Sequence, residues 1–301
     1  MKSTTVKYQY LLNVTTQEAD VIIQKIAFGK SVSGQKGTQN APDAILEASN
    51  QIEYYDEDLE WSPMKYMNIC VRDNVHKYKD ISQQVNSFNL RENQLLISLG
   101  GDHSITPQVT QGLLKNETLI VFLDAHADLR SSYMGNKWSH ATPAFHLLKA
   151  GHKMIMVGVR SLFEDEAKRI KKDKKIFFFS DRALQKQNER EKLLETLQTL
   201  EGDVYLSIDM DVFNPAYVPS VGTPQAGGID YYFATDILEA LFFNSHANIK
   251  GVDMVELIPE VSGVSQNFAA KLLQKIISYW GKSQGFHKRK ALGAQTKVEY
   301  E

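Results

Sequence analysis

Cysteine is nearly absent from this chain. Its 301 residues include a single cysteine, Cys70, so an intramolecular disulfide framework is excluded. A lone cysteine within an apolar run such as YMNICV is usually a small buried hydrophobic side chain. The composition therefore points away from small secreted scaffolds and toward a reducing compartment.

Long hydrophobic runs are also missing. The amino-terminal stretch MKSTTVKYQYLLNV is too polar to resemble a signal peptide, and no apolar run is long enough to span a bilayer. We therefore expect a cytoplasmic protein with no membrane partner.

Neither sign of charge is in excess. Lys and Arg number 34, Asp and Glu number 36, and the formal net charge is −2 at pH 7. This balance gives no reason to expect a nucleic-acid partner. The hydrophobic content of 43% is enough to bury a large core.

From about residue 66, short apolar runs alternate with longer amphipathic ones, which is typical of a mainly parallel sheet with helices on its faces. We expect strands at 66–71, 94–99, 119–124, 153–159, 175–180, 204–209 and 249–257. We expect helices at 163–172, 189–200, 231–243 and 268–280. No linker rich in Pro, Gly or Ser divides the chain, so we predict one domain, 1–301, in which about 282–301 form a loose tail or a partner contact.

Polar clusters follow three of the predicted strands. They are GGDHS at 100–104, DAHADLR at 124–130 and DMDVFNP at 209–215. In open parallel sheets, ligands bind beyond the carboxyl ends of the strands. The three clusters are therefore expected at one edge of the sheet.

These clusters offer candidate metal ligands. Residues two apart on an extended chain point the same way, so the ligands could converge if the strands run on. The candidates are four carboxylates and two imidazoles: His103, Asp124, His126, Asp128, Asp209 and Asp211. Four packed carboxylates would repel one another unless about four positive charges were present, which two divalent cations supply. Oxygen-rich ligation without thiolate suits Mn²⁺. Paired metals about 3.5–4 Å apart activate water, which points to hydrolysis.

Each motif alone has a structural explanation. DxHxD is compatible with a capped loop, the Gly pair with a tight turn, and DxD with an acidic loop. Their joint occurrence after successive strands is much harder to explain by structure alone.

In this order, GGDHS, DAHADLR, SIDMDVFNP with GTPQAGG, and VDMVE at 252–256 resemble the ureohydrolases, the family of arginase, agmatinase, guanidinobutyrase and formimidoylglutamase. The resemblance covers roughly residues 35–280. It implies a three-layer αβα arginase-like fold around a mainly parallel sheet, a guanidino substrate, two Mn²⁺ per subunit, and a homotrimer or homohexamer.

The resemblance also implies roles for individual residues. One Mn²⁺ would be held by His103, Asp124, Asp128 and Asp209. The other would be held by His126, Asp124, Asp209 and Asp211. Asp128 would also hydrogen-bond the bridging hydroxide.

Two further residues would act on the substrate. His140 would shuttle a proton, and Glu256 would bind the guanidinium. From the residues alone, His140 could instead begin a helix with a solvated ring, and Glu256 could be a surface carboxylate. Arg160 and Ser161, after another predicted strand, are interpreted as supporting the site or anchoring a loop.

The loop LRSSYMGNKWSHATP is more similar to agmatinases than to arginases, because it carries a GN-x-x-SHA pattern and Arg130 where arginases have Asn. The favoured reaction is therefore hydrolysis of agmatine to putrescine and urea, a step of polyamine biosynthesis. If Arg130 faces the pocket, it would repel the agmatine ammonium and favour a carboxylate-bearing substrate such as guanidinobutyrate, arginine or formiminoglutamate.

Two functional alternatives stay open, and the sequence differs from the family pattern at Asn214. The chain could be a catalytically silent, metal-binding regulatory relative, or a related deacylase that keeps one metal. The departure is Asn214, which stands where the family usually has Asp in DxDxxDP. An amide there can preserve the hydrogen bonds of the turn but alters the charge near the metals.

Overall fold

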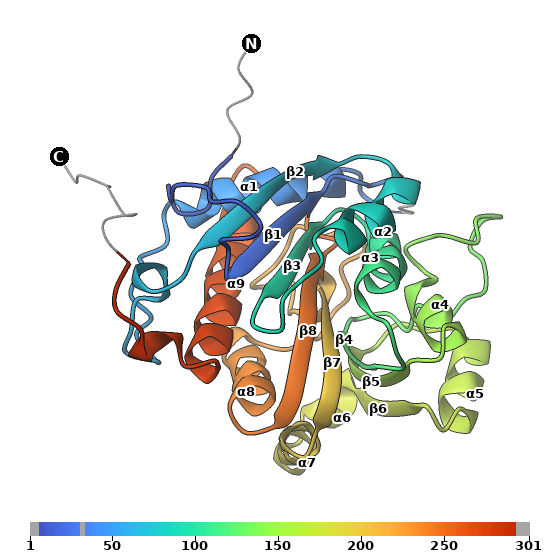
Figure 1. Cartoon of the computed structure of the whole chain (residues 1–301). Coiled ribbons are helices and arrows are strands. Elements are labelled where there is room, and N and C mark those ends of the chain that lie inside the picture. Colours follow the sequence, from blue (N-terminus) through green and yellow to red (C-terminus); the bar gives the residue numbers. More distant parts are fainter. Residues whose placement is uncertain (1–5, 31–33, 293–301) are drawn as a thin grey trace.

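The computed structural model describes residues 6–30 and 34–292, which form one parallel sheet covered by helices (Figure 1). The sheet order is β2-β1-β3-β8-β7-β4-β5-β6, and every neighbouring pair is parallel. The strands are β1 (Val21–Ile26), β2 (Ile69–Val75), β3 (Leu95–Gly100), β4 (Leu119–Leu123), β5 (Lys153–Val159), β6 (Ile176–Ser180), β7 (Glu201–Asp209) and β8 (His246–Val255). The predicted α/β class is confirmed.

Strand β1 is the one strand of this sheet that the sequence pattern did not predict. Its sequence VIIQKI is interrupted by Gln24 and Lys25, yet all six residues are buried. Their side-chain nitrogen atoms have partners: Lys25 Nζ lies 2.8 Å from Asp43 Oδ1, and Gln24 Nε2 donates to the carbonyl of Asp73. Because Gln24 and Lys25 interrupt the apolar run, the sequence pattern does not indicate a strand here.

Helices cover both faces of the sheet and form the outer layers (Figure 1). One face packs against α1 (Ala41–Ser49), α6 (Asp181–Leu184), α7 (Gln187–Gln198), α8 (Tyr231–Phe242) and α9 (Val264–Ser283). The other packs against α2 (Tyr78–Ser87), α3 (Thr106–Leu113), α4 (Pro143–Lys149) and α5 (Glu164–Lys172). The two apolar cores lie between the sheet and these layers. The four predicted helices are confirmed as α5, α7, α8 and α9, the last beginning earlier, at Val264.

The end of the described chain packs against the body, where the sequence led us to expect a loose tail or a partner contact from about 282. Phe286 is fully buried, and Arg289 makes an ion pair of 3.0 Å with Asp20. The backbone N–H of Leu292 donates to the carbonyl of Lys65. The remainder of the expected tail, 293–301, lies outside the described residues.

The free edge of β2 is occupied by a side chain. Asn13 Nδ2 donates to the carbonyl of Val71 at 2.9 Å, and the N–H of Val71 donates to Asn13 Oδ1 at 2.7 Å. One side-chain amide thus pairs with the backbone as a neighbouring strand would.

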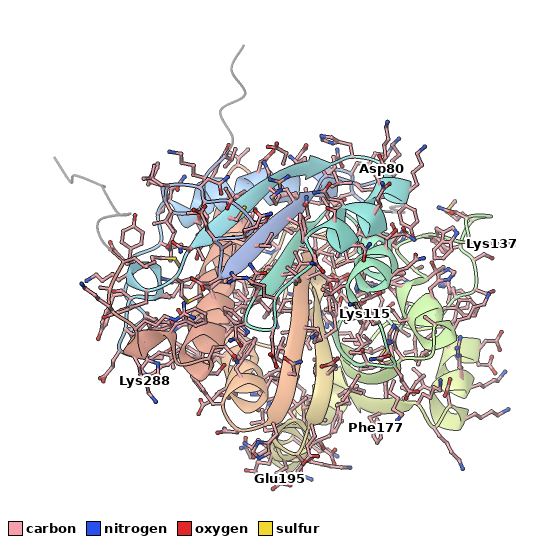
Figure 2. All side chains as sticks on the ribbon, viewed as in Figure 1. Asp80, Lys115, Lys137, Phe177, Glu195 and Lys288 are labelled. Atoms are coloured by element: carbon pink, nitrogen blue, oxygen red, sulfur yellow. The ribbon has the colours of Figure 1, made fainter. Side chains whose placement is uncertain are left out.

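Two other features of the described chain concern a projecting loop and the character of its helices. The loop between β4 and α4, which carries Lys137, projects from the body of the protein beside α4 (Figure 2). Across residues 6–30 and 34–292, none of the helices has the length and apolar character that crossing a bilayer requires.

Candidate metal centre and substrate cavity

The three polar clusters meet at the carboxyl edge of the sheet, as predicted. Strands β3, β8, β7 and β4 are consecutive in the sheet, and their register aligns their ends: Leu123 is paired with Ile208, and Asp209 with Val255. His103 follows β3, Asp124 follows β4, and Asp209 ends β7. Parallel pairing therefore brings together residues that are far apart in the sequence.

One group of ligand atoms surrounds the ring of His103. Its Nδ1 lies 3.1 Å from Asp124 Oδ2, 3.1 Å from Asp209 Oδ2 and 3.5 Å from Asp128 Oδ2. All four side chains are buried. His103, Asp124 and Asp209 each offer one atom to a position that could hold a cation, which we name the first metal position.

A second group adjoins the first. His126 Nδ1 lies 2.8 Å from Asp211 Oδ2 and 3.6 Å from Asp124 Oδ1. Asp124, His126 and Asp211 form a second metal position, and Asp124 belongs to both groups. The structure thus brings five of the six predicted ligands into two groups that share the carboxylate of Asp124, and the sixth, Asp128, lies beside the first group.

A loop, and not a continued strand, places the ligands after β4. That strand ends at Leu123, and Asp128 has a φ of 49°, so the strand does not run on through these residues. Asp124 Oδ1 accepts from the N–H of His126, and Asp211 Oδ1 accepts from the N–H of Ala125. In the third segment, Asp209 Oδ1 accepts from the N–H of Asp211. Each of these three aspartates fixes one oxygen to the backbone and turns the other toward the cluster.

A buried chain of polar groups stands behind His103, and the sequence pattern did not predict it. His103 Nε2 lies 3.0 Å from Ser207 Oγ, which donates to Asp253 Oδ1 at 2.7 Å. Tyr205 donates its hydroxyl to the other oxygen of Asp253. Such a chain holds Nε2 away from the carboxylates and directs Nδ1 toward them. The available signal was a serine two residues before Asp209, on the same face of β7, and an aspartate within an apolar strand.

The cluster is electrostatically unbalanced without cations. Burial raises the pKa of Asp128 and of Asp209, and neighbouring carboxylates raise both further. Burial also acts on Asp124, but the adjacent His103 and His126 outweigh it and bring the pKa of Asp124 down to about 2. Burial lowers the pKa of His126, but Asp124 and Asp211 raise it to about 12. The carboxylates thus favour protonation of the neighbouring groups. Bound metal cations would supply positive charge in place of these protons.

Two buried atoms of the cluster indicate whether a metal fits the site. His103 Nδ1 and Asp124 Oδ2 face each other, and within the described part of the chain neither has a hydrogen-bond partner. A buried polar atom without a partner is costly, but ring nitrogen and carboxylate oxygen are both metal ligands. Four carboxylates, two imidazoles and no thiolate fit two divalent cations.

A cavity of about 260 Å³ opens beside the second metal position. Its wall includes His126, Asp128, His140, Arg130, Tyr133, Phe163 and Thr223. His140 Nδ1 lies 3.2 Å from Ser139 Oγ, and its ring packs edge-on against Tyr133. The alternative that His140 begins a helix is wrong, because α4 begins at Pro143. His140 therefore lies on the same cavity as the ligands His126 and Asp128.

Glu256 lies next to His103. Its Oε1 accepts from the N–H of His103 at 2.8 Å, and a Cβ at Gly222 would stand 2.9 Å from its Oε2. Burial, and then the nearby Asp102, raises the pKa of Glu256 to about 8. The side chain is 4% exposed and is not among the described residues of the cavity wall. The structure thus places Glu256 against the first metal position, buried and not on the surface.

Arg130 faces the cavity, which the sequence left undecided. Its guanidinium carbon lies 3.9 Å from the centre of the Phe163 ring and 4.9 Å from that of Tyr133. All three residues belong to the cavity wall. The charge of Arg130 is therefore held on aromatic faces at the cavity.

Asn214, the departure from the family pattern, closes a turn. Its Oδ1 accepts from the N–H of Ala216, and its carbonyl accepts from the N–H of Tyr217. The side-chain amide thus supplies one hydrogen bond of the turn and the backbone carbonyl supplies the other.

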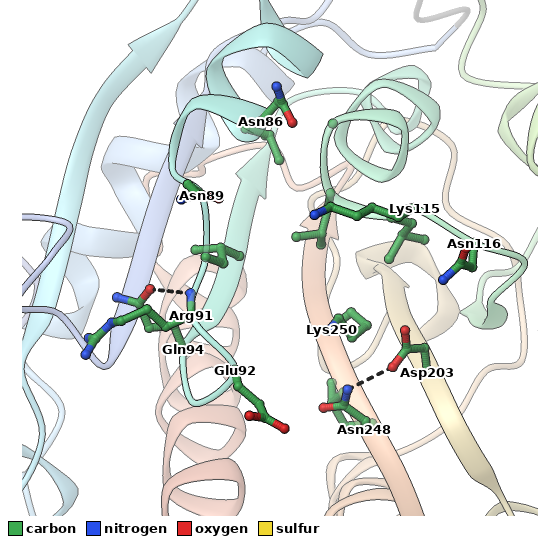
Figure 3. A pocket seen from close by; sticks show the side chains of 16 residues that line it. Asn86, Asn89, Arg91, Glu92, Gln94, Lys115, Asn116, Asp203, Asn248 and Lys250 are labelled. Carbon is green, nitrogen blue, oxygen red and sulfur yellow. Dashed lines mark hydrogen bonds between the residues drawn. The ribbon is translucent and has the colours of Figure 1, made fainter.

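Another hollow, of about 310 Å³, lies at the opposite edge of the sheet, where β3 and β8 begin (Figure 3). Lys115, Lys250, Glu92 and Asp203 contribute side chains of both charges to it, and Asp203 pairs with Asn248. None of the predicted site residues belongs to this hollow. The candidate centre is thus confined to the carboxyl edge.

Known proteins are similar to this chain in both fold and sequence. The N(1)-aminopropylagmatine ureohydrolase of Thermus thermophilus is 31% identical over 91% of this chain and 94% of its own. The agmatinase of Pyrococcus horikoshii is 31% identical over 89% of this chain and 94% of its own. The crystal structure of an agmatine ureohydrolase of Thermoplasma volcanium superposes with a TM-score of 0.80 at 29% identity, covering 95% of this chain and 98% of that one.

The sequence model of the Arginase family matches residues 19–278, which include all six candidate metal ligands, His140 and Glu256. This match spans most of the chain and agrees with the arrangement of the carboxyl edge. The chain belongs to the arginase family, a family of enzymes with two metals at the active site.

Proposed function

We propose that this protein is a manganese-dependent ureohydrolase that hydrolyses agmatine to putrescine and urea. The observation that carries the proposal is the pair of ligand groups that share Asp124 and open, through His126 and Asp128, onto a cavity that contains His140. The oxygen-rich ligand set suits Mn²⁺. The names of the relatives, agmatinase and aminopropylagmatine ureohydrolase, support a substrate with an alkyl guanidine.

The six ligands would hold two ions. His103, Asp124 and Asp209 would bind one, with Asp128 adjacent, and Asp124, His126 and Asp211 would bind the other. When bound, the ions activate water as a nucleophile at neutral pH and polarise the group that it attacks.

The other residues act on the substrate and on protons. A guanidinium stays protonated at neutral pH, since its pKa is about 12.5–13.8, and is a poor electrophile. Glu256 supplies a carboxylate that orients the cation near the first metal position. Asp128 accepts a hydrogen bond from the attacking water. His140 delivers a proton to the departing amine, and its contact with Ser139 Oγ holds the ring at the cavity.

The position of Arg130 bears on the choice of substrate. Its charge at the cavity opposes a distal ammonium, but Phe163 and Tyr133 hold it on their faces. We assign this arginine a tuning effect on substrate affinity and retain agmatine as the substrate. Aminopropylagmatine is the second candidate, because the chain resembles enzymes of that name over about nine-tenths of its length.

The test is urea release by Mn²⁺-loaded protein from agmatine, aminopropylagmatine, arginine and guanidinobutyrate, with formamide release from formiminoglutamate in parallel. We expect the highest kcat/KM for agmatine. A preference for arginine or guanidinobutyrate would overturn the substrate, and silence on all five compounds would favour the regulatory alternative. Binding of a single ion per chain would favour the one-metal deacylase.

The remaining proposals concern organisation. We propose that residues 1–301 form one ureohydrolase domain, because a single sheet joins the described elements. We propose a cytoplasmic homotrimer or homohexamer on the resemblance to the family. Light scattering coupled to size-exclusion chromatography tests the assembly, and a monomeric mass would contradict it.

A further inference from the structure

Arg160 directly follows β5 and makes an unusual set of contacts. Among the described residues, five backbone carbonyls accept hydrogen bonds from its guanidinium. They are the carbonyls of Gly158 at 3.2 Å, Asp211 at 2.7 Å, Val212 at 3.2 Å, Phe213 at 3.3 Å and Gln225 at 3.2 Å. The planar guanidinium of arginine can contact this many acceptors because it carries several N–H donors in a fixed geometry.

Both chain segments that carry the second metal position contact this residue. The side chain binds the carbonyls of Asp211 and the two residues after it. The backbone N–H groups of Arg160 and Ser161 donate to the carbonyl of Ala125, which lies between Asp124 and His126. Arg160 thus joins the loop after β4 to the loop after β7 at the ligands themselves.

The same guanidinium reaches the ring of His126 through one intermediary. Gln225, whose carbonyl accepts from Arg160, places its side-chain amide 3.4 Å from His126 Nε2. This contact lies on the side of the ring opposite Nδ1, which faces Asp211. The first metal position is supported differently, by Ser207 and Asp253 behind His103.

We propose that Arg160 is a positioning residue for the second metal position and sets the affinity of that position separately from the first. The inference rests on the proposed function in one respect, that the cluster takes two divalent cations. Arg160 holds the backbone of Asp211 and, through Gln225, the ring of His126. Residues that support ligands in this way typically contribute about 10–100-fold to metal affinity.

The test is titration of metal-free protein with Mn²⁺, followed by calorimetry and by the electron paramagnetic resonance of free and bound ion. The variants are Arg160→Lys, which keeps the charge but loses the planar fork, and Arg160→Gln. We expect wild-type protein to bind two ions. Each variant should bind one ion with unchanged affinity and the other about 10–100-fold more weakly. Arg190→Lys is the matched control, since Arg190 also donates to a backbone carbonyl, that of Leu184, and its contacts with Asp230 and Phe233 involve no candidate metal ligand.

Double variants identify the position that is affected. His126→Asn should remove the second ion, so adding Arg160→Lys should change the affinity of the remaining ion little. His103→Asn should remove the first ion, so adding Arg160→Lys should weaken the remaining ion about 10–100-fold.

Two results would overturn the inference: two ions bound with wild-type affinities in both single variants, or equal loss of both ions in both variants, including loss through unfolding. Because these measurements use no substrate, they are independent of the proposed reaction. A protein that binds two Mn²⁺ with this pattern but releases no urea would retain the inference and refute the function.

Discussion

The ring nitrogen Nδ1 of His103 and the carboxylate oxygen Oδ2 of Asp124 lie 3.1 Å apart, both buried and without a hydrogen-bond partner in the described part of the chain. Two acceptors held this close repel each other unless a proton or a cation lies between them. Burial lowers the pKa of His103, but Asp124 and Asp128 raise it to about 9, so a proton relieves this repulsion in the metal-free protein and a bound ion would take its place.

Metal binding should accordingly stabilise the protein. Free Mn²⁺ at about 100 times its Kd contributes about 2.7 kcal/mol, provided that the unfolded chain does not bind it. For a chain of this size the corresponding rise in Tm is about 5 °C. Thermal unfolding with excess EDTA and with excess Mn²⁺ measures the difference. Asp124→Asn, which alters the shared ligand, should remove most of it, and an equal shift in that variant would contradict the metal site.

The stability of metal-free protein should fall as the pH rises from about 5 to 8. Burial raises the pKa of Glu256 from 4.5 to about 8, so the folded state binds a proton that the unfolded state releases in this range. Stability from such a group is complete below the unfolded pKa and is lost toward the folded pKa, at about 1.4 kcal/mol per pH unit at most. The raised pKa values of Asp128, Asp209 and His126 act in the same direction.

Urea unfolding of metal-free protein at pH 5, 6, 7 and 8 measures this slope. Glu256→Gln should make it shallower. In contrast, the stabilisation by Mn²⁺ should grow with pH, because the ligands must lose protons to bind the ion. A metal-free protein that became more stable between pH 5 and 8 would refute the assignment.

His140→Ala should slow turnover and leave both ions bound. A positioned acid or base contributes about 10²–10⁴-fold, so we expect kcat to fall by at least about 100-fold. His146→Ala is the matched control, because His146 is close in sequence but stacks on Trp138 outside the described cavity wall. Steady-state kinetics from pH 6 to 10 and metal analysis are the measurements. Unchanged kcat and pH dependence in His140→Ala would refute the shuttle role.

Arg130→Met should favour cationic substrates. Removing a positive charge from the cavity wall should lower KM for agmatine about two- to tenfold and raise it for guanidinobutyrate, with the effect on agmatine weakening at high salt. Arg169→Met is the control, because Arg169 also stacks on an aromatic ring, that of Phe145, but is absent from the described cavity wall. If KM for both substrates moved in the same direction, the charge of Arg130 would not be the cause.

The sequence predicted the ligands because they stand where apolar runs end, and parallel pairing brings those ends together. It did not predict Ser207 and Asp253, because each is a single polar residue inside a buried strand and contacts its partner only across neighbouring strands. The same limit hid β1, whose Lys25 is neutralised by Asp43 on α1.

The orientation of Arg130 could not be predicted from the sequence, for a similar reason. It depends on Phe163, which lies after β5 and is not a sequence neighbour of the loop that carries Arg130. Patterns of apolar residues and turns are local, whereas this contact is set by which strands are neighbours in the sheet.

The amide of Asn13 has a consequence for assembly. It occupies both backbone groups of Val71 that face outward from β2, so a further strand could add there only after displacing it. Continuation of the sheet from one molecule into the next is thereby disfavoured along this edge. At this end of the sheet, copies of the chain that associate would therefore do so through helices and loops and not by adding a strand beside Val71.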